Sequence, residues 1–316
     1  MTRAWCVFEL WVALHQLSPG CIRVASGPIS LQDIMRCAHA LSPQELRATR
    51  ADDGLEITRI LENRSNNGLQ GVRSLINAFF KVQPVYHSVD LIPLHSQPLP
   101  DQLAARVADW KQSDARCLWI SGPDGRGKST LSKMLLQKGM VHAIHSVRAN
   151  CAQSQDADSL VRNVAFQLAL QFSVAMGDYF LELSVNSALS QTNSFDTFLV
   201  LPLQTLTRFY HNTKGGNAGQ LPEVVILIDG IDAINLIASG TNSGGRDLLS
   251  MLCAEIYHLP INVKLIVTGA WDPWIAHKLS SAFHPLSQLE LEKGTLASAD
   301  EVSVKELADR TFCHAH

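Results

Sequence analysis

Residues 122–129 read Gly-Pro-Asp-Gly-Arg-Gly-Lys-Ser, and this stretch decides the fold of the chain. It fits the pattern G-x-x-x-x-G-K-[ST] at every required position. An apolar run, Cys117 to Ser121, precedes it, and a helical stripe of Leu131, Met134 and Leu135 follows it. In such a strand–loop–helix unit, glycines let backbone N–H groups point at phosphate oxygens, and the positive end of the helix adds to the attraction. The sequence therefore predicts a phosphate-binding loop.

Two side chains of this loop are predicted to contact a nucleoside triphosphate and its metal. Lys128 should reach the β- and γ-phosphates, and the Ser129 hydroxyl should hold Mg²⁺. The predicted cofactors are therefore ATP and Mg²⁺, and adenine is favoured over guanine because the chain lacks an N-K-x-D segment. The predicted nucleotide-binding residues are Gly122, Pro123, Asp124, Gly125, Arg126, Gly127, Lys128, Ser129 and Thr130.

A phosphate loop also needs a carboxylate at the end of a neighbouring strand to orient the waters of the metal. Asp229 ends the aliphatic run Val-Val-Ile-Leu-Ile at residues 224–228, which is typical of a strand covered on both faces. We predict Asp229 as a metal ligand together with Ser129, and Asp229 and Asp232 as the catalytic residues. Two interpretations of Asp232 stay open: it could position a water molecule, or it could cap a helix.

Strand and helix patterns alternate from residue 100 onward. Apolar runs predict strands at Cys117 to Ser121, Val141 to Arg148, Val224 to Ile228 and Val263 to Thr268. A long helix is expected over residues 160–172, and loops rich in Gly, Asn and Ser over 211–222 and 238–245. The alternation predicts an α/β P-loop NTPase three-layer fold with a parallel sheet and helices on both sides.

A small, mostly helical partial domain is expected before this fold, over residues 1–81. Residues 69–80 form an amphipathic helix pattern, Cys21 to Ala25 is a short strand candidate, and Ser42 to Glu45 is a helix start. Several prolines then interrupt the pattern, which predicts a linker over 82–99. The NTPase domain is expected over 100–290, and a truncated helical C-terminal tail over 291–316.

The helix candidate Ala4 to Leu14 is apolar on nearly every face, which is normal for a helix buried inside a domain. It is too short to span a bilayer, and Glu9 interrupts the apolar core that a signal peptide would need. Because the sequence before it cannot cover this helix, we expect the chain to begin inside a domain whose upstream part is missing.

Composition and charge narrow the class of protein. The chain has 26 Lys and Arg against 29 Asp and Glu. It contains no polybasic block of the kind that predicts binding to nucleic acids or membranes. Seven cysteines without CxxC spacing favour reduced thiols and a cytoplasmic location. His142 and His145 are disfavoured as a metal pair, because on a strand their three-residue separation points the rings to opposite faces.

Residues 100 to 290 resemble the NACHT class of signal-transduction ATPases, and specifically its nephrocystin-3-like branch. The matching stretches are Cys-Leu-Trp-Ile-Ser at 117–121, Arg-Ala-Asn at 148–150, Phe-Gln-Leu-Ala at 166–169, Asp-Gly-Ile-Asp at 229–232 and Val-Lys-Leu-Ile-Val-Thr-Gly at 263–269. The resemblance implies an ATP-dependent switch that is closed with ADP, assembles with ATP bound, and is reset by slow hydrolysis. It also implies protein partners or self-assembly.

Two positions depart from the pattern of this family. An acidic residue commonly follows the second aspartate, where this chain has Ala233, and a sensor arginine commonly follows the strand ending in Thr268, where it has Ala270. Loss of a cation at the transferring phosphate can lower the rate by orders of magnitude. A scaffold that binds nucleotide without hydrolysing it therefore stays open as an alternative.

The N-terminal stretch Trp-Cys-Val-Phe-Glu-Leu, residues 5–10, resembles the W-C-x-x-E-L helix of TIR domains. In the enzymatic members of that family the matching glutamate cleaves NAD, so the resemblance implies a TIR-type NAD glycohydrolase remnant around Glu9. A buried structural helix is the competing reading, since a lone carboxylate does not make an active site. Small-molecule kinases share the phosphate loop, but no arginine-rich lid is visible near the C-terminal end.

Overall fold

The fold is taken from a computed structural model, which describes residues 4–16, 48, 50–65, 68–83, 98–184, 187–188, 194–213, 221–234 and 248–291. The strands are β1 Cys117–Ser121, β2 Ala143–Ser146, β3 Val224–Asp229, β4 Val263–Gly269 and β5 Leu286–Glu290. The helices are α1 Ala4–Gln16, α3 Ala51–Arg64, α4 Gly68–Val82, α5 Asp101–Gln112, α6 Lys128–Gln137, α7 Ala152–Gln155, α8 Ala157–Gln171, α9 Ser173–Glu182, α11 Leu201–Thr213, α12 Leu248–Glu255 and α13 Pro273–Ala282, with a π-helix η3 at Asp196–Val200 and 3-10 turns η4 Ile231–Ala233 and η6 Ile256–His258.

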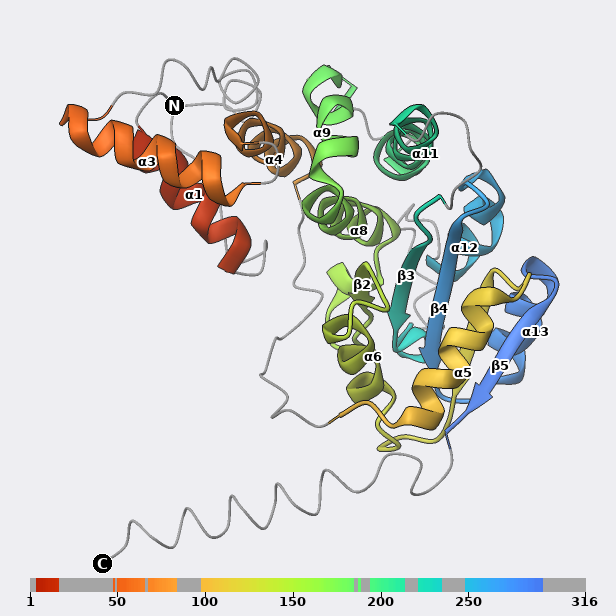
Figure 1. The fold of residues 1–316 in the computed structure, drawn as a ribbon. Coiled ribbons are helices and arrows are strands. Elements are labelled where there is room, and N and C mark those ends of the chain that lie inside the picture. Colours follow the sequence, from red (N-terminus) through yellow and green to blue (C-terminus); the bar gives the residue numbers. More distant parts are fainter. Residues whose placement is uncertain are drawn as a thin grey trace, which may run out of the picture.

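The five strands form one sheet in the order β2-β3-β4-β1-β5, and every pair is parallel (Figure 1). Strand β4 therefore lies between β1, which leads into the phosphate loop, and β3, which ends at Asp229. The register pairs Ser121 with Gly269 and Ile228 with Val267, so the carboxyl ends of these three strands meet at one edge. That edge is where ligands bind in open parallel sheets.

Helices cover both faces of the sheet, because its strands alternate two sets of apolar side chains. Leu118 and Ile120 of β1 pack against α5 and α6, whereas Cys117 and Trp119 of the same strand face the core that contains α8, α12 and α13. Every residue of β1, β3 and β4 is buried. The predicted three-layer α/β fold with a parallel sheet is confirmed.

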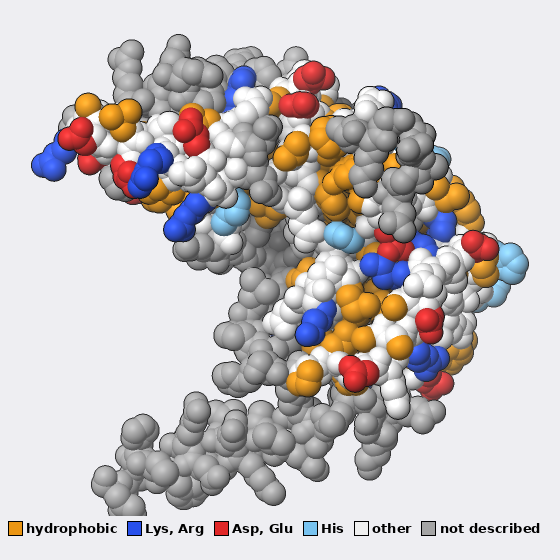
Figure 2. All heavy atoms as spheres, in the orientation of Figure 1, with side chains coloured by type: hydrophobic (Ala, Val, Ile, Leu, Met, Phe, Trp, Pro, Cys, Tyr) orange, Lys and Arg blue, Asp and Glu red, His pale blue; other side chains and the backbone are white. Residues whose placement is uncertain are grey.

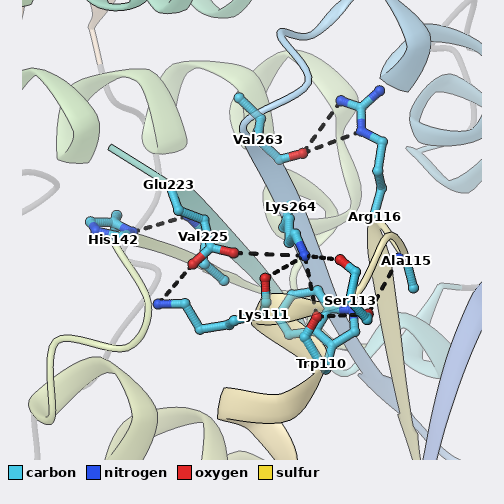
Figure 3. A network of polar contacts seen from close by, with 10 residues as sticks. All are labelled: Trp110, Lys111, Ser113, Ala115, Arg116, His142, Glu223, Val225, Val263 and Lys264. Atoms are coloured by element: carbon cyan, nitrogen blue, oxygen red, sulfur yellow. Dashed lines mark hydrogen bonds and ion pairs between the residues drawn. The ribbon is translucent and has the colours of Figure 1, made fainter. Parts of the chain in front are cut away.

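The opposite edge of the sheet, at the amino ends of the strands, is fastened by a polar network around Lys264 (Figure 3). The buried Lys264 ammonium donates to the carbonyl oxygens of Trp110 at 3.2 Å, Lys111 at 2.6 Å and Ser113 at 2.6 Å, at the C-terminal end of α5. Glu223 lies 3.8 Å from this ammonium and 3.0 Å from that of Lys111. A cation is favoured at the C-terminal end of a helix, where the last carbonyls point out of the helix, so the network holds α5 against the sheet.

Helix α4 lies between the N-terminal helices α1 and α3 and the layer formed by α8 and α9 (Figure 1). Apart from Arg73, its residues from Gly71 to Val82 are buried. Phe79 packs edge-on against Phe166 of α8, with ring centroids 5.7 Å apart. The last helix of the N-terminal region therefore shares a core with the sheet-bearing part of the chain.

Several element boundaries differ from the sequence predictions. The edge strand β5 was not predicted, because its burial is incomplete and its sequence Leu-Ser-Gln-Leu-Glu mixes polar residues into the strand. The prediction of a strand over residues 141–148 was wrong at both ends, since β2 covers only Ala143–Ser146. The loop predicted from residue 211 was wrong for its first residues, because α11 continues to Thr213. The predicted long helix is α8, and its N-cap is Asp156, whose side chain accepts a hydrogen bond from the Ser159 N–H.

Some predictions fall outside the described residues. These are the strand candidate at 21–25, the helix start at 42–45, most of the linker at 82–99, the loop at 238–245 and all but the first residue of the C-terminal tail. On the described part of the face in Figure 2, basic and acidic side chains are interspersed over the surface. Among the described helices, none has both the length and the apolar character to cross a membrane.

Candidate functional site

The loop between β1 and α6 has the backbone of a phosphate cradle. Gly125 and Gly127 adopt left-handed conformations with φ of 73° and 80°, which side-chain-bearing residues rarely adopt. Gly127 is also the N-cap of α6, and its carbonyl accepts the Leu131 N–H at 2.8 Å. A Cβ on Gly122 would lie 2.9 Å from the Leu291 carbonyl oxygen, so this glycine is required by close packing.

Lys128, the first residue of α6, folds back across the loop. Its ammonium donates to the carbonyl oxygens of Gly122 at 2.7 Å and Pro123 at 3.0 Å, and lies 3.8 Å from a carboxylate oxygen of Asp124. The Lys128 side chain is 10% exposed, whereas that of Asp124 is 93% exposed. The cation is thus held over the loop, where phosphate oxygens can replace neutral carbonyl acceptors and gain a stronger, charge-assisted contact.

Asp229 ends β3 at the same edge, and the residue is 7% exposed. Its Oδ1 accepts two hydrogen bonds, from the Ser132 hydroxyl of α6 at 2.9 Å and from the Thr268 hydroxyl of β4 at 2.7 Å. Residue 230 must be glycine, because it has a φ of 77° and a Cβ there would lie 2.9 Å from the Val147 carbonyl oxygen. Ser132 thus links the carboxylate to the helix that begins at the phosphate loop, and Thr268 links it to β4.

Ser129 lies one helical turn before Ser132, so both hydroxyls are on one side of α6. Ser129 is exposed, while Ser132 is buried against Asp229. A hydroxyl from α6 and a carboxylate from β3 are the kind of oxygen donors that Mg²⁺ prefers, with phosphate oxygens and water completing the shell. The residues present therefore fit MgATP, with Lys128 on the phosphates and with Ser129 and Asp229 toward the metal.

The remaining loop residues differ in their exposure. Gly122 is buried, whereas Arg126, Gly127 and Thr130 are half-buried and Pro123, Asp124, Gly125 and Ser129 are exposed. The exposed positions surround the start of α6, so a ligand can reach the backbone N–H groups there.

Asp232 and Ala270 also lie near the carboxyl edge. The Asp232 carboxylate is exposed, and its Oδ1 lies 2.8 Å from where a Cβ on Gly269 would stand. The N-cap of the 3-10 turn η4 is Gly230, so Asp232 does not cap this turn. Ala270 directly follows β4 and is half-buried.

The other candidate residues lie apart from this edge or have structural partners. His142 accepts the Val225 N–H through Nδ1 at 3.0 Å, and the buried His145 pairs through Nε2 with the Ser154 carbonyl at 2.8 Å. Within the described residues, no group of three or more His, Cys, Asp or Glu side chains is placed so that these side chains alone could hold a metal ion. Glu9 is exposed on α1, and its NAD-cleaving role stays a prediction.

Two cavities lie away from the phosphate loop. One, of about 300 Å³, is lined by Arg106 and Asp109 of α5 and by Ser287 and Gln288 of β5, among others. The other, of about 90 Å³, lies near Arg116 and Tyr257. Neither includes a predicted nucleotide-binding residue.

Comparison with models of known protein families identifies the family to which this chain belongs. The family model of the nephrocystin 3 N-terminal region matches residues 104–269, which is more than half of the chain and includes the loop, Asp229 and Thr268. The chain belongs to this nephrocystin 3 N-terminal family. Family and fold together make it a nucleotide-binding, ATPase-like protein of the NACHT and nephrocystin type, as the sequence resemblance indicated.

The nephrocystin-type chain was also compared with curated proteins and with solved structures. No curated protein matches its sequence. Among solved structures, a chain from the structure of Drosophila ORC bound to GC-rich DNA and Cdc6 is 13% identical, with a TM-score of 0.32. The alignment covers 92% of this chain but only 39% of that one, so this chain spans about two fifths of its length.

The polar contacts of Ser132, Thr268 and Lys264 were not predicted from the sequence. Each depends on a partner far away in the sequence: Ser132 lies 97 residues from Asp229, and Thr268 lies 39 residues from it. A polar residue inside an otherwise apolar strand, as at Lys264 and Thr268, was the available signal.

Proposed function

We propose that this protein is an ATP- and magnesium-binding switch of the NACHT type, with its NTPase domain over residues 100–290. The observation that carries the proposal is the tie between the two halves of the site. Lys128 spans the phosphate loop at the start of α6, and four residues later Ser132 of the same helix holds the Asp229 carboxylate. One rigid helix thus carries both the phosphate contacts and the support of the metal-orienting carboxylate.

The chemistry assigned to the residues follows from their charges and positions. Lys128 and the N–H groups of residues 125–130 bind the phosphates, while Ser129 and Asp229 orient the metal and its waters. Bound Mg²⁺ supplies charge neutralisation at the transferring phosphate. Asp232, exposed beside Gly269, is the second carboxylate proposed to orient the attacking water. Slow hydrolysis would separate an ATP state that assembles with protein partners in the cytoplasm from a closed ADP state.

Titration with a fluorescent ATP analogue in the presence of Mg²⁺ tests the binding part of this proposal. Lys128→Ala should weaken the affinity at least about a hundredfold, because it removes a partly buried cation from the phosphates. Lys138→Ala, an exposed lysine at the other end of α6, makes the same charge change and should bind like the wild type. Equal affinity of Lys128→Ala and Lys138→Ala would refute nucleotide binding at this loop.

A scaffold that binds nucleotide without turnover is the alternative, and it is favoured by Ala233 and Ala270. Each occupies a position at the carboxyl edge where a charged side chain would assist hydrolysis. Phosphate release from purified protein decides between the two. Release above background that is lost in Asp229→Asn supports the hydrolysing switch, whereas wild-type protein that binds ATP and releases no phosphate supports the scaffold.

A further inference from the structure

Ser132 is a buried residue of α6 that the phosphate-loop pattern does not assign to any task. The residue is 1% exposed, and its hydroxyl lies 2.9 Å from Oδ1 of Asp229 and 3.0 Å from the carbonyl oxygen of Lys128. A hydroxyl carries a single proton, so it can donate fully to only one of these two acceptors. The carboxylate is the stronger acceptor because it is charged.

The second acceptor gives Ser132 an alternative. If Asp229 moves or changes its partners, the Ser132 hydroxyl can turn to the Lys128 carbonyl, one helical turn back, without leaving a buried donor unpaired. Ser132 thus connects the residue whose ammonium spans the phosphate loop with the carboxylate at the end of β3.

Thr268 holds the same carboxylate from the other side. Its Oγ1 accepts the Gly230 N–H at 3.1 Å, so its own proton is free to be donated to Asp229, which it does at 2.7 Å. Thr268 is 1% exposed, and it belongs to β4, the strand between β1 and β3. Both hydroxyls use Oδ1 of Asp229, and neither of them uses Oδ2.

We propose that Ser132 and Thr268 are positioning residues that fix the orientation of the Asp229 carboxylate, so that Oδ1 is occupied by protein hydroxyls and Oδ2 stays available to the metal's water. This inference rests on the proposed function, because it assigns a role at the same MgATP site. A free carboxylate rotates about its terminal torsion, whereas two hydroxyls on one oxygen, coming from a helix and a strand, define one orientation.

Nucleotide affinity measured with and without Mg²⁺ tests the role of Ser132 separately from its packing. A fluorescent ATP analogue is titrated into the full chain in EDTA and again over a series of Mg²⁺ concentrations, for the wild type, Ser132→Ala and Ser132→Thr. Ser132→Ala should lower the Mg²⁺-dependent affinity about tenfold, the equivalent of roughly one charge-assisted hydrogen bond. It should leave the affinity in EDTA within about twofold of the wild type, and Ser132→Thr, which keeps the hydroxyl, should recover most of the loss.

Thr268→Val, which keeps the side-chain shape, provides the second arm and should show the same selective loss. If Ser132→Ala fails to fold in a thermal unfolding measurement, Thr268→Val decides the question alone. Equal losses in EDTA and in Mg²⁺, or no loss in either, would overturn the proposal. Lys128→Ala in the same assay distinguishes failure of the proposed function from failure of the positioning role. If Lys128→Ala binds nucleotide as tightly as the wild type, the proposed function is refuted. If Lys128→Ala does not bind and Ser132→Ala binds like the wild type, only the positioning role is refuted.

Discussion

The Lys81 ammonium lies 2.6 Å from the Phe180 carbonyl oxygen, within the buried junction between α4 and α9. It also donates to the Leu181 carbonyl at 3.2 Å, so a cation of α4 satisfies the last turn of α9. The reverse contact exists as well, because the Arg162 guanidinium of α8 donates to the Val82 carbonyl at 2.7 Å. Cations at helix C-terminal ends are favoured by the helix dipole, and here they join α4 to the α8–α9 layer in both directions.

We expect Lys81→Met to loosen this junction. The substitution keeps a side chain of similar length but leaves the Phe180 and Leu181 carbonyls without this donor. It should lower the free energy of unfolding by roughly 1–3 kcal/mol. Chemical denaturation measures the loss, and hydrogen exchange should locate it at the ends of α4 and α9. Lys138→Met, at an exposed position, is the matched control. Unchanged exchange at both helix ends would contradict the assignment.

Lys264→Met should destabilise the opposite edge of the sheet. The Lys264 ammonium holds three carbonyls at the end of α5, and burial lowers its pKa from the ordinary value. Removing it leaves these acceptors and Glu223 without their shared cation, which should cost about 3 kcal/mol in the free energy of unfolding. Because this network lies at the amino ends of the strands, the nucleotide affinity of the folded variant should stay close to that of the wild type. A variant that keeps full stability would show that water replaces the ammonium there.

Gly230→Ala should be markedly more harmful than Gly139→Ala. Both glycines have positive φ, of 77° and 66°, so each substitution carries a backbone penalty of about 1 kcal/mol. A Cβ at Gly230 additionally meets the Val147 carbonyl at 2.9 Å, whereas one at Gly139 meets nothing within 4 Å. We expect a total of roughly 3 kcal/mol for Gly230→Ala, together with weaker Mg²⁺-dependent nucleotide binding, because the turn directly follows Asp229. Equal unfolding midpoints for the two variants would disprove the clash.

The buried His145 should make the fold sensitive to mild acid. Burial lowers the pKa of His145 to about 4, so the ring is neutral in the folded state, while in the unfolded chain it takes up a proton near pH 6.5. The unfolded state therefore binds more protons between pH 6.5 and 4, and stability falls as the pH is lowered through this window, by at most about 3 kcal/mol.

Denaturation curves at several pH values measure this effect. In His145→Gln the fall in stability over the window should be smaller than in the wild type, whatever the absolute stability of the variant. His277→Gln, at an exposed position on α13, should keep the wild-type slope. A His145→Gln protein with the wild-type slope would mean that His145 is not the titrating group.

The parts of the molecule that could be predicted are those whose sequence pattern lies within a few consecutive residues. The loop at 122–129, the strand before it and the aliphatic run before Asp229 each fit within one short window, and the structure has β1 at the predicted residues. Parallel order followed from the alternation of strands and helices. The edge strand β5 carries no such signal, because an edge strand needs no continuous apolar run.

The support of the site was not predictable in this way. A serine in the middle of α6 has no distinctive neighbours in the sequence, and its contact depends on Asp229, which the fold brings beside it at the end of strand β3. Lys264 sits inside an apolar run and is tolerated there only because the end of α5 supplies carbonyls. Both contacts require the three-dimensional arrangement, and single-sequence patterns do not encode it.

The burial of α4 on nearly all sides has a practical consequence for recombinant work. A truncated protein that starts at residue 100, just before α5, would lack this helix and expose the surfaces of α8 and α9 that it covers, including the place where Phe79 contacts Phe166. Such a product should be poorly soluble even though it keeps every phosphate-contacting residue. Expression that begins upstream of Gly68 retains the aromatic cover and is the form in which nucleotide binding is best measured.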